Sequence, residues 1–173
     1  MAIIKSKKFI LRPISKSDAP EVARLANDKT VYRNTAVLPY PYTLKDANWW
    51  ITDTIKNYRK KKIEKYAFVI EIAGKFAGVV ALEKIVPGHK ATLGYWLGRE
   101  YWGQGIMTDA VRLVSDFAFR QYKIKRLYAY AFPWNKASMR VMEKAGMKFE
   151  GVRRKNTLKD GKFLDEHVFA KVK

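Results

Sequence analysis

Residues 92–108 read Thr92-Leu93-Gly94-Tyr95-Trp96-Leu97-Gly98-Arg99-Glu100-Tyr101-Trp102-Gly103-Gln104-Gly105-Ile106-Met107-Thr108. The apolar and aromatic run 93–97 predicts a β-strand, and from residue 106 onward the apolar residues take the spacing of an α-helix. Between the two lies a tight loop that contains Gly103 and Gly105. Glycine adopts positive φ angles and lets a ligand approach the main chain closely. The stretch therefore predicts a strand, a glycine loop and a helix in immediate succession.

The start of this helix is a candidate anion site. The N–H groups of residues 105–108 have no intrahelical acceptor and lie at the positive end of the helix dipole. A diphosphate is a frequent ligand of such a site. A turn that needs glycine only for steric reasons explains the same pattern, so the loop alone leaves both interpretations open. It is not a Walker A motif, because no Gly-Lys-Ser/Thr follows, and it lacks the third glycine of the dinucleotide fingerprint.

Three short motifs surround or follow this loop. They are Tyr95-Trp96-Leu97, then Tyr101-Trp102-Gly103-Gln104-Gly105, and then Asn135-Lys136-Ala137-Ser138 with Glu143-Lys144-Ala145-Gly146-Met147 after it. Together they resemble the GCN5-related N-acetyltransferase (GNAT) family over nearly the whole chain. Within the family the chain is most similar to the branch of the RimJ/RimL ribosomal-protein N-terminal acetyltransferases. The resemblance implies acetyl-CoA as co-substrate and a primary amine as acceptor.

The resemblance assigns the glycine loop to acetyl-CoA. The family's loop is often written Q/R-x-x-G-x-G/A, and here those positions hold Trp102, Gly105 and Met107. Tryptophan is usual for this branch, whereas Met107 is bulkier than the usual small residue. The implied cofactor-binding residues of the loop are Trp102, Gly103, Gln104, Gly105, Ile106, Met107 and Thr108, with the diphosphate held by main-chain N–H groups.

The resemblance also assigns the strand before the loop, Tyr95, Trp96 and Leu97, to the pantetheine arm. In the family this strand splays from the next one, and its free backbone groups bind the pantetheine amides as an added strand would. Core packing is the alternative for the aromatic side chains. The two roles use different atoms and are compatible.

Ser138 is the most informative single residue. On the helix that begins near residue 136, it shares a face with Val141, Met142 and Ala145, so a hydroxyl faces apolar neighbours. A hydrogen bond to the N-cap residue Asn135 explains this without any ligand. The resemblance implies instead that Ser138 protonates the leaving thiolate of CoA and that Asn135 holds the pantetheine arm.

Two basic residues of the same helix, Lys136 and Arg140, share its outer face. They could meet the 3′-phosphate of CoA, and a solvated helix face explains them equally. A general base is harder to find, because Thr92 and Leu93 stand where many family members place a glutamate. Glu83, on the preceding strand, is the nearest carboxylate that could act through water, and a salt bridge is the alternative explanation for it.

Asp165 and Glu166 on the last strand are weaker candidates for the base. Some N-terminal acetyltransferases carry an acid after the sixth strand, where this chain has Asn156 and Thr157. A site without a base favours an acceptor whose amine loses its proton easily. An α-amine has a pKa of about 7.7–8.0, against about 10.4 for lysine. More of it is uncharged at neutral pH, which favours a peptide N-terminus as acceptor.

The charge balance is unusual. The 173 residues include 35 Lys and Arg against 16 Asp and Glu, so the formal net charge is +19. Such a field favours anionic ligands and disfavours polycationic substrates such as polyamines, unless the pocket is locally acidic. Many of these lysines belong to a solvated surface. The excess as a whole predicts a phosphate-rich partner, which could be CoA, RNA or the ribosome.

Length and composition bound the protein class. A chain of 173 residues, 48% of them hydrophobic, is long and apolar enough to form a single domain, residues 1–173, with its own core. No apolar run near 18 residues and no signal peptide are found, which predicts a cytoplasmic protein without membrane association. Zero cysteines exclude disulfides and thiolate sites, and two distant histidines, His89 and His167, argue against a metal centre. The sequence is compatible with a homodimer.

The other elements follow from periodicity, caps and turns. Strands are predicted at 8–14, 66–73, 76–86, 91–97, 126–131, 147–153 and 163–172. Helices are predicted from a cap at Ser17 or Asp18, over 43–62 and 104–122, and from Asn135 to Gly146. The loop 38–42 either covers the core or, as the resemblance implies, forms a wall of the acceptor groove. The order describes an α/β (α+β) fold with a mixed, mostly antiparallel sheet of six to seven strands and about four helices.

These observations predict an N-acetyltransferase that acts on the N-terminal α-amine of a protein by direct attack in a ternary complex. Two alternatives remain at this stage. One is a non-catalytic RNA- or ribosome-binding domain on the same scaffold, and the other is an acetyltransferase for a small-molecule amine.

Overall fold

The computed structural model describes residues 2–173. Its centre is one sheet of eight strands in the order β1-β2-β3-β4-β5-β6-β8-β7. All neighbouring pairs of these described strands are antiparallel except β5 and β6, which run parallel. This confirms the mixed, mostly antiparallel sheet. The strands span Ile4–Lys5 (β1), Ile10–Pro13 (β2), Tyr66–Ile72 (β3), Lys75–Val86 (β4), Lys90–Leu97 (β5), Arg126–Ala131 (β6), Lys148–Lys159 (β7) and Lys162–Val172 (β8).

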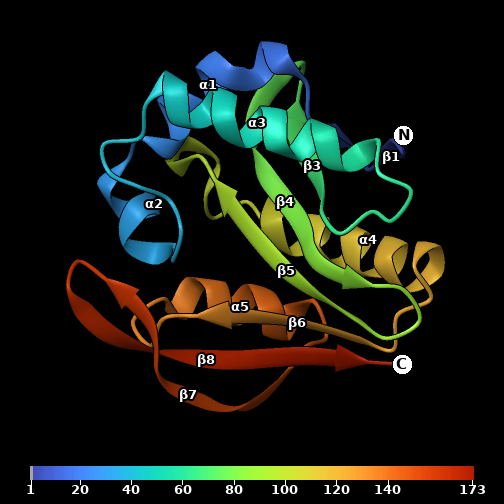
Figure 1. The fold of residues 1–173 in the computed structure, drawn as a ribbon, viewed down its shortest axis with the longest axis vertical. Helices are drawn as coiled ribbons and strands as arrows, with labels where there is room; N and C mark the ends of the chain where they lie inside the picture. The colour runs from blue at the N-terminus through green and yellow to red at the C-terminus, as the bar shows by residue number, and fades with distance from the viewer. Residues whose placement is uncertain (1) are drawn as a thin grey trace.

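Helices cover both faces of the sheet. α1 and α3 pack on one face, and α4 and α5 pack on the other, while α2 lies beside the end of the β7–β8 hairpin (Figure 1). Each face therefore has its own apolar cluster. The helices span Ala19–Ala26 (α1), Lys29–Asn34 (α2), Leu44–Tyr58 (α3), Ile106–Gln121 (α4) and Lys136–Lys144 (α5).

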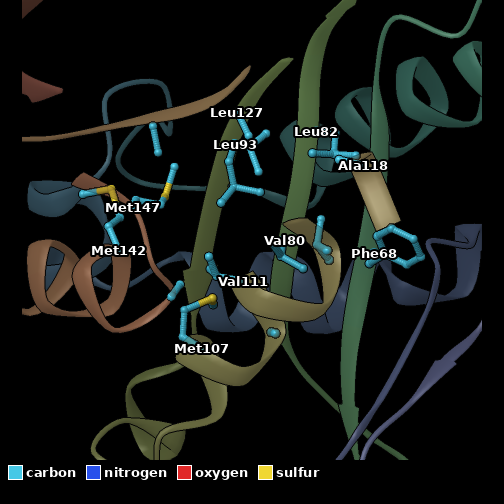
Figure 2. Close-up of a cluster of buried hydrophobic side chains, with 14 of the residues drawn as sticks. Phe68, Val80, Leu82, Leu93, Met107, Val111, Ala118, Leu127, Met142 and Met147 are labelled. Carbon is cyan, nitrogen blue, oxygen red and sulfur yellow. The ribbon is translucent and has the colours of Figure 1, made fainter. Parts of the chain in front are cut away.

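The larger cluster lies between the sheet and α4. Figure 2 shows Leu82 and Leu93 of the central strands meeting Val111 and Ala118 of α4, with Met142 of α5 beside them. Helical spacing on α4 and alternation on the strands bring one side of each element into this layer. Burying these side chains fixes α4 against the ends of β4 and β5. The start of α4 is thereby held next to the end of β5.

Two short elements were not predicted. β1 has two residues, and α2 has six, too few for a periodic pattern to develop. α2 is capped by Asp28, whose carboxylate accepts hydrogen bonds from the backbone N–H groups of Thr30 and Val31. The predicted sheet of six to seven strands therefore lacked one edge strand, and the predicted set of about four helices lacked α2.

The helix predicted over 43–62 ends at Tyr58. Thr43 and Asp46 form a capping box at its start, and Trp49 on this helix has 71% of its surface exposed. The predicted side-chain cap of α1 is wrong. Asp18 precedes α1, but its carboxylate accepts hydrogen bonds from Arg12 and Ser15 rather than from the helix N–H groups.

The closing hairpin is confirmed around its predicted turn, because β7 and β8 are joined through residues 160 and 161. β7 is longer than predicted and continues to Lys159 with register shifts on the way. The shift between Arg153 and Thr157 changes which side chains of β7 lie opposite β8. This irregularity bears on the site described below.

Candidate functional site

The two central strands separate at the middle of the sheet. β5 and β6 pair only from Lys90 with Arg126 to Thr92 with Tyr128, so the side of β5 that faces β6 has no strand partner over residues 93–97 (Figure 1). This confirms the predicted splay. An open strand edge offers backbone groups to an extended ligand, as in β-strand addition.

A cavity of about 650 Å³ lies at this opening. It is lined by the glycine loop, β5, the first turn of α5 and the segment that follows α2. The wall includes the residues assigned to acetyl-CoA and the first candidate base: Glu83, Tyr95, Trp96, Leu97, Trp102, Gly103, Gln104, Gly105, Ile106, Met107, Thr108, Asn135 and Ser138.

The glycine loop has the geometry of an anion site. Gly103 and Gly105 have φ angles of +78° and +73°, in the left-handed region that favours glycine. Within residues 2–173, the backbone N–H groups of 103–108 donate no hydrogen bond to the protein. Six donors near the positive end of the α4 dipole are therefore free for an anionic ligand.

Two side chains brace this loop. The indole Nε1 of Trp102 donates to the carbonyl oxygen of Leu97 at 2.8 Å, which ties the loop to the end of β5. Lys8 reaches from the N-terminal segment to Asp109 of α4, with 3.3 Å between Nζ and Oδ2, and to the carbonyl of Gln104. Both contacts hold the loop without using its N–H groups.

Met107 does not crowd the loop. Its side chain is buried among the core residues between α4 and the sheet (Figure 2). The bulk that distinguishes it from the family pattern therefore points into the core, and its backbone N–H remains with the free donors of the loop.

Ser138 contacts Tyr95 on the cavity wall. Its N–H donates to Oδ1 of Asn135 at 3.2 Å, which confirms Asn135 as the N-cap of α5. Its hydroxyl Oγ lies 2.8 Å from the phenol oxygen of Tyr95, which also lies 3.2 Å from the Ser138 carbonyl. The cap contact uses the backbone N–H of Ser138 and leaves its hydroxyl to the contact with Tyr95.

The Tyr95 phenol is a functional group that the sequence did not reveal. Burial raises the pKa of Tyr95 well above its ordinary value, and the hydrogen bond with Ser138 opposes this only in part. The phenol is therefore protonated at neutral pH and can donate. Alternation along β5 predicted packing for this ring, and no local signal marked its contact with a residue 43 positions away.

Glu83 also lines the cavity, from β4. The salt bridge offered as its alternative explanation is wrong, since Glu83 makes no ion pair with any of residues 2–173. It pairs with Thr92 of β5. The Thr92 hydroxyl is buried and, across the described part of the chain, has no hydrogen-bond partner.

Glu166 is the second carboxylate on the cavity wall. It is 5% exposed, and its two oxygens accept hydrogen bonds from Asn156 Nδ2 at 2.7 Å and Thr157 Oγ1 at 2.6 Å. The predicted weak candidate Asp165 is not on the wall and instead accepts from the backbone N–H of Lys155. Asn156 and Thr157 occupy the positions where some N-terminal acetyltransferases carry an acid. Here they donate hydrogen bonds to an acid, Glu166, on the neighbouring strand β8.

The far wall is formed by the segment after α2 and by Tyr42. The Tyr42 side chain is buried, and burial raises its pKa to about 12. Tyr40 of the same loop is 42% exposed. The interpretation that this loop covers the core is confirmed, because Tyr42 packs in the core cluster beneath α1 and α3, and Tyr42 also lines the cavity.

The hairpin end closes this wall. Lys159 donates hydrogen bonds to the carbonyl oxygens of Tyr32 and Thr35, and its Nζ lies 3.7 Å from the centre of the Tyr32 ring. Asp160 accepts a hydrogen bond from the Tyr32 hydroxyl. These contacts attach the β7–β8 hairpin to α2 and the segment after it.

Of the two basic residues of α5, Arg140 lines the cavity, together with Lys144, whereas Lys136 is exposed and lies off its wall. Over residues 2–173, no His, Asp or Glu side chains gather in a group of three that could hold a metal ion. None of the helices in this range is both long and apolar enough to cross a membrane.

A comparison with protein families decides the assignment. Residues 8–148 match the acetyltransferase (GNAT) domain. The chain belongs to the GNAT family. This GNAT protein is 36% identical over 175 residues to the probable N-acetyltransferase YjcK of Bacillus subtilis (strain 168), covering 97% of this chain and 96% of that one. It is 29% identical over 142 residues to the spermidine N(1)-acetyltransferase of Escherichia coli (strain K12), covering 82% and 73% of the two chains.

A solved structure with the same fold is the RimL ribosomal L7/L12 α-N-protein acetyltransferase in complex with coenzyme A. Its TM-score is 0.89 at 22% identity, covering 99% of this chain and 98% of that one. This GNAT protein is thus an acetyl-CoA-dependent acyltransferase. The free N–H groups at residues 103–108 and the open edge of β5 fit that co-substrate. The family assignment favours an enzyme over the non-catalytic RNA- or ribosome-binding alternative.

Proposed function

We propose that this GNAT protein acetylates the α-amine at the N-terminus of a protein. The observation that carries the proposal is that β5, which borders the cavity, contains no carboxylate along its length. An acceptor whose amine is already partly uncharged at neutral pH suits such a site better than a lysine side chain does. The RimL fold neighbour, whose name states an α-N-protein activity, lends further support.

The chain's own residues divide the work along the cavity. The N–H groups of residues 103–108 hold the diphosphate, and the open edge of β5 holds the pantetheine arm beside Asn135. Backbone donors at the end of β5 polarise the thioester carbonyl as negative charge develops on its oxygen. Ser138 gives a proton to the departing thiolate. Glu83 serves as the candidate relay through which the amine loses its proton to water.

The test is a comparison of acceptors. Purified protein is given acetyl-CoA and a panel of peptides with free N-termini, the same peptides with N-termini blocked and an internal lysine, and small amines, while thiol release is measured. Mass spectrometry locates the acetyl group. We expect the free N-termini to give the highest kcat/KM. Faster acetylation of internal lysines or small amines would contradict the proposal.

A small-molecule amine is the second candidate acceptor. The protein's net charge of +19 opposes a polyamine, but Glu83 and Glu166 on the same cavity wall supply the local acidity that such a substrate needs. One relative is named as a spermidine N(1)-acetyltransferase, so spermidine is included among the small amines of the test. Spermidine turning over faster than every peptide would favour it.

Association with the ribosome or RNA rests on the charge alone. A salt-dependent affinity for ribosomes, measured by co-sedimentation at two ionic strengths, tests it separately from catalysis.

A further inference from the structure

Glu166 is a buried charge without a counter-ion. Two charged side chains of the described chain are buried, Asp18 and Glu166. Asp18 is paired with Arg12 at 2.7 Å. Glu166 has no Lys, Arg or His nitrogen within 4.0 Å in residues 2–173, although the protein carries 35 Lys and Arg. Its partners are the neutral side chains of Asn156 and Thr157.

The cation nearest in register is turned away from it. Arg153 of β7 is the register partner of Glu166 on β8, but the shift between Arg153 and Thr157 breaks the regular ladder here. The Arg153 guanidinium instead donates to the Tyr130 hydroxyl at 2.7 Å and lies over that ring, 5.2 Å from its centre. Arg153 and Glu166 are thus register partners that form no ion pair with each other.

Burying a carboxylate costs desolvation free energy. Hydrogen bonds from neutral donors orient the carboxylate but do not cancel its charge, so they offset only part of that cost. One donor on each oxygen leaves further lone pairs unused. Glu166 lies on the wall of the cavity that also contains Ser138 and Tyr95. The compensating positive charge can therefore arrive with a ligand in that cavity.

We propose that Glu166 is the binding site for the ammonium group of the acceptor and takes the proton that this group must lose. The proposal deepens the proposed function and rests on it. One proton passes from R–NH₃⁺ to the carboxylate, and the amine nitrogen then forms a bond to the thioester carbon. The C–S bond breaks, and the thiolate gains a proton from Ser138, which is replenished by the second proton of the attacking nitrogen. Glu166 returns its proton to water.

This assignment separates Glu166 from Glu83. Both carboxylates line the cavity, but no hydrogen bond holds the carboxylate of Glu83 within the part of the chain described here. Glu166 is oriented by two donors, as a group that must meet a substrate atom at a defined position requires. In this assignment Glu166 replaces Glu83 as the group that takes the proton, and Glu83 is left as a second cation site for a longer acceptor.

The experiment compares Glu166→Gln, Glu83→Gln and Asp165→Asn. Gln keeps the shape of Glu166 while removing its charge, and Asp165 is the adjacent carboxylate off the cavity wall. We expect Glu166→Gln to lower kcat/KM for the best acceptor at least 100-fold. Asp165→Asn should change kcat/KM less than threefold, and the acetyl-CoA affinity of all three should stay within threefold of wild type.

Folding and binding controls keep the outcome clear. Removing an uncompensated buried charge should leave the melting temperature of Glu166→Gln unchanged or higher. Calorimetry on the CoA-loaded protein compares an acceptor peptide with its N-acetylated form, which carries no ammonium. Wild type should prefer the free peptide at least tenfold, and Glu166→Gln should lose that preference.

The two proposals fail in different ways. If wild type acetylates only small amines or lysines, the proposed protein N-terminal acceptor is wrong, and the role of Glu166 is then measured with that better acceptor. If Glu166→Gln keeps kcat/KM within threefold, or still prefers the free ammonium as wild type does, the role of Glu166 is overturned. A large loss in Glu83→Gln with none in Glu166→Gln would move the ammonium site to Glu83.

Discussion

The hydroxyl groups of Tyr95 and Ser138 lie 2.8 Å apart on the cavity wall, joining the end of β5 to the first turn of α5. Because burial raises the pKa of Tyr95, its phenol keeps its proton, and it donates to the Ser138 carbonyl at 3.2 Å. In the proposed mechanism, Ser138 gives a proton to the thiolate, and Tyr95 positions Ser138.

Ser138→Ala should lower kcat about 100-fold, the lower end of the range for a lost general acid. Tyr95→Phe keeps the buried ring and should lower kcat by about tenfold, since only the orienting hydrogen bond is lost. The ratio of the wild-type kcat to the Tyr95→Phe kcat should stay constant from pH 6 to pH 9, because the raised pKa of Tyr95 keeps the phenol neutral throughout. Initial rates of thiol release measure both.

Tyr122→Phe is the matched control, because Tyr122 follows α4 and lies outside the cavity. An equal loss in Tyr122→Phe and Tyr95→Phe would show that a missing phenol acts through stability instead. A Ser138→Ala rate within twofold of wild type would remove Ser138 from the chemistry.

Gly105→Ala should weaken acetyl-CoA binding. A Cβ at residue 105 would meet only Lys8 Nζ at 3.8 Å, so the cost arises from the φ angle of +73° and not from a clash. We expect about 1 kcal/mol of lost stability and a loop that shifts its free N–H groups. Calorimetric titration with acetyl-CoA should give a several-fold higher Kd.

Gly74→Ala carries the same type of strain far from the site. Gly74 has a φ of +78° in the turn between β3 and β4, and a Cβ there meets nothing within 4 Å. It should lose similar stability and keep the wild-type Kd for acetyl-CoA. Equal weakening in both variants would mean that the glycine loop has no special relation to the ligand.

Local patterns were enough to predict the elements that form the site. The strand, glycine loop and helix at residues 92–108, the N-cap Asn135 and the splay implied by the family all lie as predicted. Side-chain partners between distant segments were not predictable, because they depend on register and irregularity. The shift after Arg153 decides what Glu166 contacts, and no sequence period reports it. Met107 likewise needed the packing of α4 to show which way its side chain points.

Asp18 should make stability depend on pH. Burial raises the pKa of Asp18, but the hydrogen bonds from Arg12 and Ser15 outweigh this and hold it below its ordinary value. A carboxyl with a lowered folded-state pKa stabilises the fold above its unfolded pKa of about 3.9, and this is lost as the pH falls through the folded-state value. Asp18→Asn should cost on the order of 2 kcal/mol at pH 7.

Urea unfolding of wild type and Asp18→Asn at pH 7, 5 and 3 measures this difference. The difference between the two proteins should narrow as the pH falls below the unfolded pKa of about 3.9, because only the wild type loses the stabilisation of an ionised Asp18. Asp46→Asn is the comparison, because hydrogen bonds from Thr43 likewise lower the pKa of Asp46, but Asp46 is exposed. Its effect at pH 7 should be smaller, and a gap that persists unchanged at pH 3 would contradict the ionic origin.

Lys159 should control the acceptor and not acetyl-CoA. Its ammonium donates to the carbonyl oxygens of Tyr32 and Thr35, and Thr35 lies on the cavity wall. Lys159→Met keeps most of the aliphatic length and removes the donors, so the segment after α2 loses its attachment to the hairpin. We expect KM for the acceptor to rise about tenfold, while KM for acetyl-CoA stays within twofold, because the glycine loop lies on other elements. Lys162→Met, at an exposed lysine three residues further on, removes the same charge and should change neither KM. Equal effects of the two variants on the acceptor would mean that Lys159 acts through the long-range field of the protein, whose range a rise in salt concentration shortens.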